Sequence, residues 1–131
     1  MDNMKEWARS KTIAEMPWSS GNESVLGELR LILVALFEGT KFSVKRNPTE
    51  SECCVNIYCE GEVDRIGYIY PKARFKLFDF VLSNEFVDKL RPRMELPADM
   101  DVKKGKVYNS RQYRIPVEKV VEIAECLAHC C

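Results

Sequence analysis

The chain has 131 residues, which is close to the commonest size of a single domain and too short for two comfortable ones. Hydrophobic residues make up 46% and charged residues 31%, a globular profile that excludes the disordered and fibrous classes. Twenty Lys and Arg balance twenty Asp and Glu, so global charge weighs against phosphate binding and leaves association with another protein or with itself unopposed. We therefore expect a single domain over residues 1–131, with residues 1–20 as an N-terminal helical arm.

The sequence shows neither a secretory signal nor a membrane span. The first residues lack a positive start followed by an apolar run, and the longest apolar stretch, residues 31–37, is far shorter than the roughly 20 residues of a membrane span. We expect a soluble cytoplasmic protein without a membrane partner. In that reducing compartment the six cysteines would be thiols and not disulfides.

Two helices are predicted in the first third of the chain. A short one spans residues 5–15 and stops before Pro17. This N-terminal arm contains Trp7 and Trp18, which must rest against the body of the domain or dock onto a partner. The second begins near Asn22 and continues at helical spacing through residues 25–37 to a stop at Gly39. Leu31 and Val34 widen its apolar surface, so we expect cover from the arm or from a second subunit.

From residue 41 the apolar period changes to two, which predicts strands. The predicted strands surround Phe42 and Val44 and then span residues 53–59, 63–70 and 74–80. The turns between them are predicted at Asn47-Pro48-Thr49, Glu60-Gly61-Glu62 and Pro71-Lys72. Four consecutive strands with short turns make an antiparallel meander.

The last third of the chain alternates helix, loop, strand and helix. Ser83 is predicted to cap a helix that ends before Pro92, and residues 91–110 form a long loop with a short strand at 107–108. Long loops in compact domains are often functional, so a binding surface is expected there first. A further strand over residues 112–115 precedes a final helix from Pro116, whose core face runs from Val117 to Cys131.

These elements predict an α+β fold in which a meander of about four to six strands packs against two main helices, in the order α-α-β-β-β-β-α-β-α. The order is similar to that of the secretion-chaperone-like group of folds, including the YjbR-like and TfoX N-terminal domains. This similarity, which no diagnostic motif accompanies, implies that both main helices lie on one face of the sheet. The other face or an edge would be left for a partner or a second subunit, and the function would have to come from the side chains there.

No catalytic set stands out in the sequence, and we predict no catalytic residue, cofactor or metal ligand. Cys126, His129 and Cys130 fall on neighbouring faces of one helix, so a zinc site completed by Cys53, Cys54 and Cys59 is an alternative, although no Cys-x-x-Cys pair is present. The other interpretation makes the cysteines core and helix-end residues. Nucleotide-binding and esterase motifs are absent from the sequence.

Local charge is more informative than net charge. Between residues 103 and 114 basic residues follow one another without an acid and alternate with tyrosines, and Lys72, Arg74 and Lys76 line a second short segment. Basic side chains interleaved with aromatic ones can hold phosphates and stack on bases, or they can bind acidic proteins. A solvated loop with ordinary surface charge is the third interpretation.

The first hypothesis is a non-catalytic protein–protein interaction protein, such as a small adaptor, chaperone, immunity protein or inhibitor, that occupies the surface of a partner. Interfaces favour Tyr, Trp and Arg anchors. The predicted partner-binding residues are Trp7, Trp18, Tyr68, Tyr70, Lys103, Lys104, Lys106, Tyr108, Arg111, Tyr113 and Arg114. The alternatives are a nucleic-acid-binding module that uses the two basic segments, and a zinc-binding protein. A homo-oligomer is compatible with each.

Overall fold

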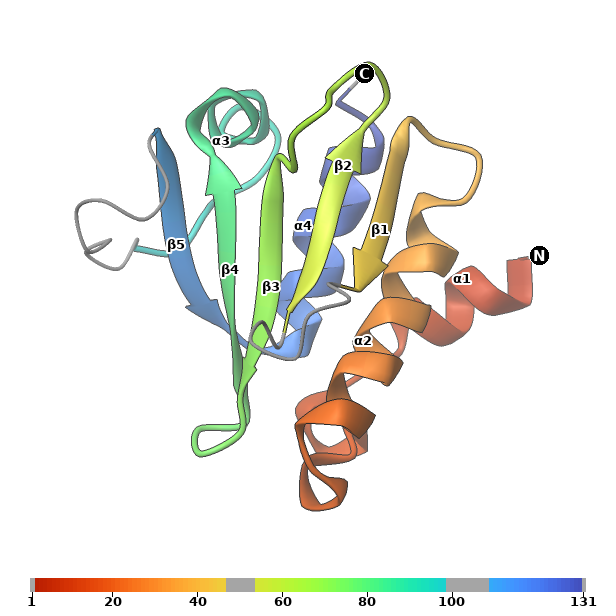
Figure 1. Ribbon diagram of the computed structural model, residues 1–131. Helices are drawn as coiled ribbons and strands as arrows, with labels where there is room; N and C mark the ends of the chain where they lie inside the picture. Colours follow the sequence, from red (N-terminus) through yellow and green to blue (C-terminus); the bar gives the residue numbers. More distant parts are fainter. Residues whose placement is uncertain (1, 47–53, 99–108, 131) are drawn as a thin grey trace.

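The computed structural model describes residues 2–46, 54–98 and 109–130, and in them an antiparallel sheet of five strands in the order β1-β2-β3-β4-β5 (Figure 1). The strands are β1 (Phe42–Arg46), β2 (Val55–Cys59), β3 (Gly67–Lys72), β4 (Leu77–Ser83) and β5 (Ser110–Ile115). The α-helices are α1 (Asp2–Arg9), α2 (Asn22–Phe37), α3 (Asn84–Leu90) and α4 (Val117–Ala128), and two short 3₁₀ turns are η1 (Ile13–Glu15) and η2 (Trp18–Ser20). The predicted α+β class and element order are confirmed.

One face of the sheet is packed against α2 and α4. Alternate residues of each strand point to this covered face, among them Ile57 in β2, Ile69 in β3 and Phe80 in β4, and all three are fully buried. The helices contribute residues such as Leu29 and Val120 to the same core. Figure 1 shows α4 behind the sheet and α2 at the side of β1, so the second face of the sheet is turned toward the viewer.

Helix α2 follows its predicted limits. Its apolar residues recur at helical spacing and are buried from Val25 to Phe37, and Gly39 adopts a φ of 77°, the left-handed conformation expected after a helix. Helix α1 packs against α2 and buries Ala8 completely. Leu31 and Val34 are nevertheless exposed, because the arm covers another side of α2.

The predicted arm helix is too long. Helix α1 ends at Arg9, where the Ser10 hydroxyl donates to the carbonyl of Trp7 at 2.8 Å and competes with a further helical turn. The chain then folds through η1 and η2. The indole N–H of Trp18 donates to the carbonyl of Ile13 at 2.8 Å, and its ring centroid lies 5.3 Å from that of Phe78. The arm therefore rests on the body of the domain.

The third and fourth strands begin later than predicted. The third begins at Gly67 and not at residue 63, because residues 60–66 form a polar loop in which Val63 is exposed. Pro71 does not break the strand, and it pairs with Phe78 of β4. The pairing of β3 with β2 ends at Ile69, so among the described residues the missing N–H of Pro71 removes no hydrogen bond between β3 and β2. The turn lies at residues 73–76, and Phe75 belongs to it and not to a strand face.

The C-terminal elements match their predictions closely. Strand β5 begins at residue 110, two residues earlier than expected, and pairs with β4 along its whole length. Pro116 is the N-cap of α4 and not a residue of its first turn. The predicted turn at 47–49 and short strand at 107–108 lie outside the described residues. None of the helices in the described ranges combines the length and apolar character needed to cross a bilayer.

Candidate functional site on the uncovered sheet face

The second face of the sheet carries polar and aromatic side chains, and none of the described helices lies over it (Figure 1). We call this surface the uncovered face. Its polar and charged residues include Lys45 from β1, Asn56 and Tyr58 from β2, Tyr68, Tyr70 and Lys72 from β3, Asp79 from β4, and Gln112 and Arg114 from β5, and the buried Val81 of β4 lies on the same face. The antiparallel register places Tyr70 and Arg114 on the two sides of Asp79.

Asp79 is the centre of a hydrogen-bonded network that joins three strands. Its side chain is 1% exposed, and Arg114 holds it through two bonds, from Nε to Oδ1 at 2.8 Å and from a terminal nitrogen to Oδ2 at 3.2 Å. Gln112 donates to Oδ2 at 3.0 Å and to the Tyr70 hydroxyl oxygen at 3.1 Å. The ammonium of Lys72 lies 4.0 Å from Oδ2. The buried carboxylate is therefore fully paired, which a buried charge requires.

The network perturbs its own titratable groups. Burial, the Asp79 charge and a hydrogen bond to that carboxylate raise the pKa of the Tyr70 hydroxyl to about 12. The hydrogen bond to Asp79 likewise raises the pKa of the Arg114 guanidinium above its ordinary value, against a smaller effect of desolvation. Both shifts preserve the charge states seen in the network, with a neutral phenol and a cationic guanidinium beside the carboxylate.

Four side chains form a stacked ladder along β3, which we define as Arg65, Tyr68, Tyr70 and Lys72. The guanidinium carbon of Arg65 lies 4.1 Å from the centroid of the Tyr68 ring. The Tyr68 and Tyr70 rings are stacked with centroids 6.0 Å apart, and the Lys72 ammonium lies 5.2 Å from the Tyr70 centroid. Each ring therefore has the other ring and one cation as close neighbours, and each cation gains a quadrupole partner.

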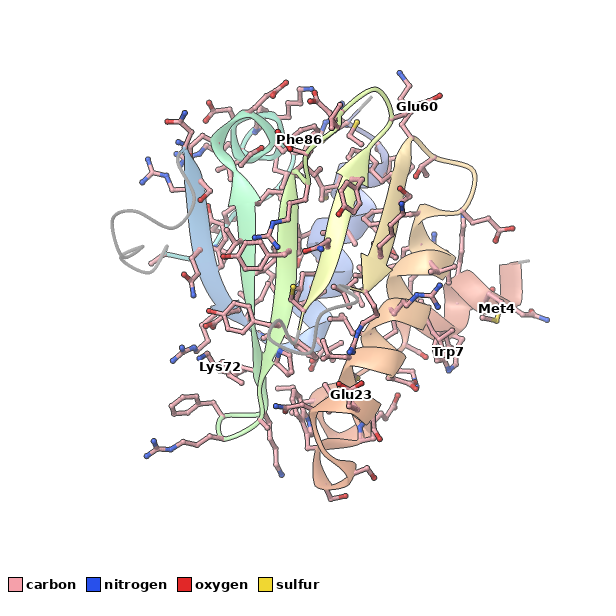
Figure 2. All side chains as sticks on the ribbon, in the orientation of Figure 1. Met4, Trp7, Glu23, Glu60, Lys72 and Phe86 are labelled. Atoms are coloured by element: carbon pink, nitrogen blue, oxygen red, sulfur yellow. The ribbon has the colours of Figure 1, made fainter. Side chains whose placement is uncertain are left out.

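Basic side chains gather at one end of the sheet. Figure 2 shows Lys72 at the end of the sheet that carries the β3–β4 turn and Glu60 at the other end. That turn exposes Arg74, Lys76 and Phe75, and the Phe75 ring is 50% exposed with the guanidinium carbons of Arg74 and Arg114 at 5.5 Å and 5.0 Å from its centroid. One end of the uncovered face is thus basic and aromatic.

Two hollows adjoin the sheet. One, of about 660 Å³, lies between β1 and the β2–β3 loop, where Lys41 and Lys45 are offset by Glu60 and Glu62. The other, of about 620 Å³, lies between the 3₁₀ turns of the arm and the β3–β4 turn. The residues that line the second hollow are Ile13, Ala14, Met16, Trp18, Ser19, Ala73 and Lys76.

The structure separates the predicted partner-binding residues. Tyr68, Tyr70 and Arg114 lie together on the uncovered face. Tyr113 is 2% exposed and packs in the core, so its prediction as a surface anchor is corrected, because alternate residues of β5 point to opposite faces. Arg111 is exposed, but the register places it on the covered side of β5, away from Arg114.

The two tryptophans lie in the helical layer. Trp7 and Trp18 are half-buried and pack against the core, and Figure 2 shows Trp7 beside α1 and α2, away from the uncovered face. The arm is therefore packed on the body of the domain, one of the two placements that the sequence left open, and partner binding by either tryptophan stays a prediction. Lys103, Lys104, Lys106 and Tyr108, which were also predicted to bind a partner, lie outside the described residues.

Sequence reasoning missed Asp79, Gln112 and Arg65. A signal for Asp79 was present, because it is the one charged residue in the apolar run of residues 77–82 and a strand buried on both faces admits a carboxylate only with a partner. The contact between Arg65 and Tyr68 has no such signal. It depends on how the β2–β3 loop returns to the sheet, which local spacing does not encode.

The cysteines do not gather in the described parts of the chain, where no group of three or more His, Cys, Asp and Glu side chains could hold a metal ion. Cys54 and Cys59 belong to opposite faces of the second strand. Burial, with smaller effects of Glu122 and Glu125, raises the pKa of the Cys126 thiol. The remaining residues of the zinc alternative, Cys53 and Cys131, lie outside the described residues.

No family model matches the chain, and neither a curated protein nor a solved structure matches it. The similarity to the secretion-chaperone-like folds therefore rests on element order alone.

Proposed function

We propose that the protein is a non-catalytic interaction protein that binds another protein through the uncovered face, as a small adaptor, chaperone, immunity protein or inhibitor would. The observation that carries the proposal is a sheet with one face packed by helices and the other presenting tyrosines and cations with no described helix over them. Tyr and Arg are the residue types that interfaces favour as anchors. The proposal places the protein in the cytoplasm, where its thiols stay reduced.

The chemistry of Asp79 and Tyr70 supports binding over catalysis. A general base needs a carboxylate with a free lone pair facing a substrate, but the oxygens of Asp79 accept bonds from Arg114 and Gln112 in a buried site. A tyrosine nucleophile or base needs a lowered pKa, whereas the pKa of Tyr70 is raised to about 12. The polar network therefore serves to hold the face in shape.

The stacked ladder favours a protein over a nucleic acid as the partner. Bases bind single-strand platforms by stacking on open aromatic rings. In the ladder the two tyrosine rings stack on each other, with Arg65 over Tyr68 and Lys72 over Tyr70, so a base would have to displace one of these contacts. The cations at the basic end keep nucleic-acid binding as the second candidate, because they could neutralise phosphates.

The test is affinity capture from native lysate with quantitative comparison of three baits. The first is the wild type, the second carries Lys45→Glu and Tyr58→Ala on the uncovered face, and the third carries Arg30→Glu on the exposed surface of α2 as a control. Proteins that bind the wild type should be retained by the control and lost from the uncovered-face variant. Equal retention by all three baits would remove the proposal.

A salt titration distinguishes nucleic-acid binding, the second candidate, from binding to a protein. Binding to a labelled single-stranded oligonucleotide should be weak, and if it occurs it should fall linearly on a logarithmic salt scale. Specific oligonucleotide binding that the uncovered-face variant abolishes would replace the protein partner with a nucleic acid.

A further inference from the structure

The hollow of about 620 Å³ beside the β3–β4 turn is lined by five apolar and two polar residues among those described, and its exposed wall is about half apolar. Met16 is buried, and Trp18 is fixed by its N–H bond to Ile13 and by its contact with the Phe78 ring. Its volume lies within the usual range of ligand sites, roughly 300 to 1,000 Å³. A pocket whose aromatic wall is already ordered loses little conformational entropy when a side chain enters it.

The side of the hollow formed by the β3–β4 turn is cationic. Among the described residues that line it, Lys76 alone is titratable. Its backbone N–H bonds to the carbonyl of Ala73 at 3.1 Å and its φ of 55° closes the turn, so the start of its side chain is fixed at the rim. Arg74 is exposed in the same turn, and Glu15 is exposed on the opposite wall between the lining residues Ala14 and Met16.

We propose that this hollow is a docking site for a peptide segment of a partner protein that carries one large apolar side chain next to carboxylates. The apolar side chain enters the hollow beside Trp18, and a carboxylate on its flank pairs with Lys76 and Arg74. Charge complementarity selects this occupant, since the β3–β4 turn supplies Lys76 to the lining of the hollow and carries the exposed Arg74 two residues before it. The inference rests on the proposed function, because its ligand is part of a protein partner, and it names the chemistry of that partner.

A random peptide library displayed on phage tests the site without knowledge of the partner. Selection on the wild type, with counter-selection on Ala73→Phe, removes every peptide that binds elsewhere, since Ala73 is an exposed lining residue and a ring at this position takes up part of the hollow. Circular dichroism confirms that each variant folds. The enriched peptides should share a large apolar residue flanked by Asp or Glu. No enrichment, or an enriched set that is basic or lacks an apolar residue, would overturn the proposal.

Synthetic versions of the selected peptides then report on the hollow directly. The chain has two tryptophans, so Trp7→Phe leaves Trp18 as the single reporter. Peptide addition should shift Trp18 emission saturably, and a peptide with Ala in place of its apolar residue should not. Lys76→Glu should weaken binding about two- to fivefold, the effect of losing one exposed ion pair. Arg30→Glu carries the same charge change away from the hollow and should bind normally. An unchanged emission, or equal weakening by both charge reversals, would refute the assignment.

The two proposals can fail separately. The uncovered-face variant, with Lys45→Glu and Tyr58→Ala, leaves the lining of the hollow intact, so it should still bind the selected peptides. If the uncovered-face variant loses lysate partners and the peptide selection fails, only the proposal of a docking site in the hollow is refuted. Peptide binding without any lysate partner at the uncovered face would refute only the broader proposal for that face.

Discussion

Replacing Arg114 by alanine removes the main partner of a buried carboxylate. The two hydrogen bonds at 2.8 Å and 3.2 Å are lost, and Asp79, with a side chain 1% exposed, keeps Gln112, the Tyr70 hydroxyl and the Lys72 ammonium at 4.0 Å. Removing one partner of a buried ion pair costs about 3 to 5 kcal/mol. Arg114 is 29% exposed and water can reach its place, so we expect a loss of about 2 to 3 kcal/mol in the free energy of unfolding.

Urea unfolding at neutral pH measures this loss, and a double-mutant cycle assigns it. Arg114→Lys keeps the charge but not the bidentate geometry and should lose about 1 kcal/mol. In the cycle of Arg114→Ala with Asp79→Ala, the coupling energy should be about 2 kcal/mol, because the second substitution removes the charge that the first leaves unpaired. A single-variant loss below about 0.5 kcal/mol with no coupling would show that water solvates Asp79 and that the network does not hold the strands.

Three further substitutions test the sheet and its surroundings. Gly67→Ala should lower the free energy of unfolding in urea by about 2 kcal/mol or more, because a Cβ at this position would collide with the Val81 carbonyl oxygen. Gly27→Ala, which has open space around it on an exposed side of α2, should raise that free energy by about 0.5 to 1 kcal/mol, and similar effects of the two substitutions would contradict the β3–β4 pairing. Tyr70→Phe should alter stability at high pH: the phenol ionises near pH 10 when unfolded and near pH 12 when folded, so the wild type loses stability across that window and the variant does not. The free energies of unfolding of the wild type and of Tyr70→Phe should therefore approach each other by about 1 kcal/mol between pH 8 and pH 11, after allowance for the partial exposure of Tyr70. A difference that stays constant with pH would mean that water solvates the Tyr70 hydroxyl.

Local sequence signals predicted the elements that depend on local periodicity. The apolar spacing of residues 25–37 and the Gly39 stop predicted α2 correctly, because a helix buries one stripe wherever it packs. Period-two alternation predicted the strands but not where they pair. Pro71 was read as a break because proline is excluded from central strands, yet only the pairing of β3 with its neighbours shows that this residue contacts β4 alone among the described strands.

Only part of the candidate site was predicted, because residues were grouped by their distance along the sequence. Arg111, Tyr113 and Arg114 were grouped because they are close in sequence, but a strand sends neighbours to opposite faces, and strict use of that rule would have paired Arg114 with Gln112 and separated both from Tyr113. The network around Asp79 needs the register of three strands. The hollow forms because the arm contacts the β3–β4 turn, which lies some 55 residues later in the chain. Local sequence patterns do not predict such a contact.

The presence of an ion pair in the centre of the uncovered face is itself informative. Buried ion pairs can often be replaced by apolar residues of similar volume without loss of stability, so stability alone does not require Asp79 and Arg114. Strand β4 is already apolar on both sides of Asp79, where Phe78 and Phe80 fill the core. A leucine pair in place of Asp79 and Arg114 would extend that apolar character to a face over which none of the described helices lies, and would favour association without selectivity. The carboxylate and its partners keep the face polar and hold Tyr70 of the stacked ladder, as the proposed binding of a specific protein partner requires.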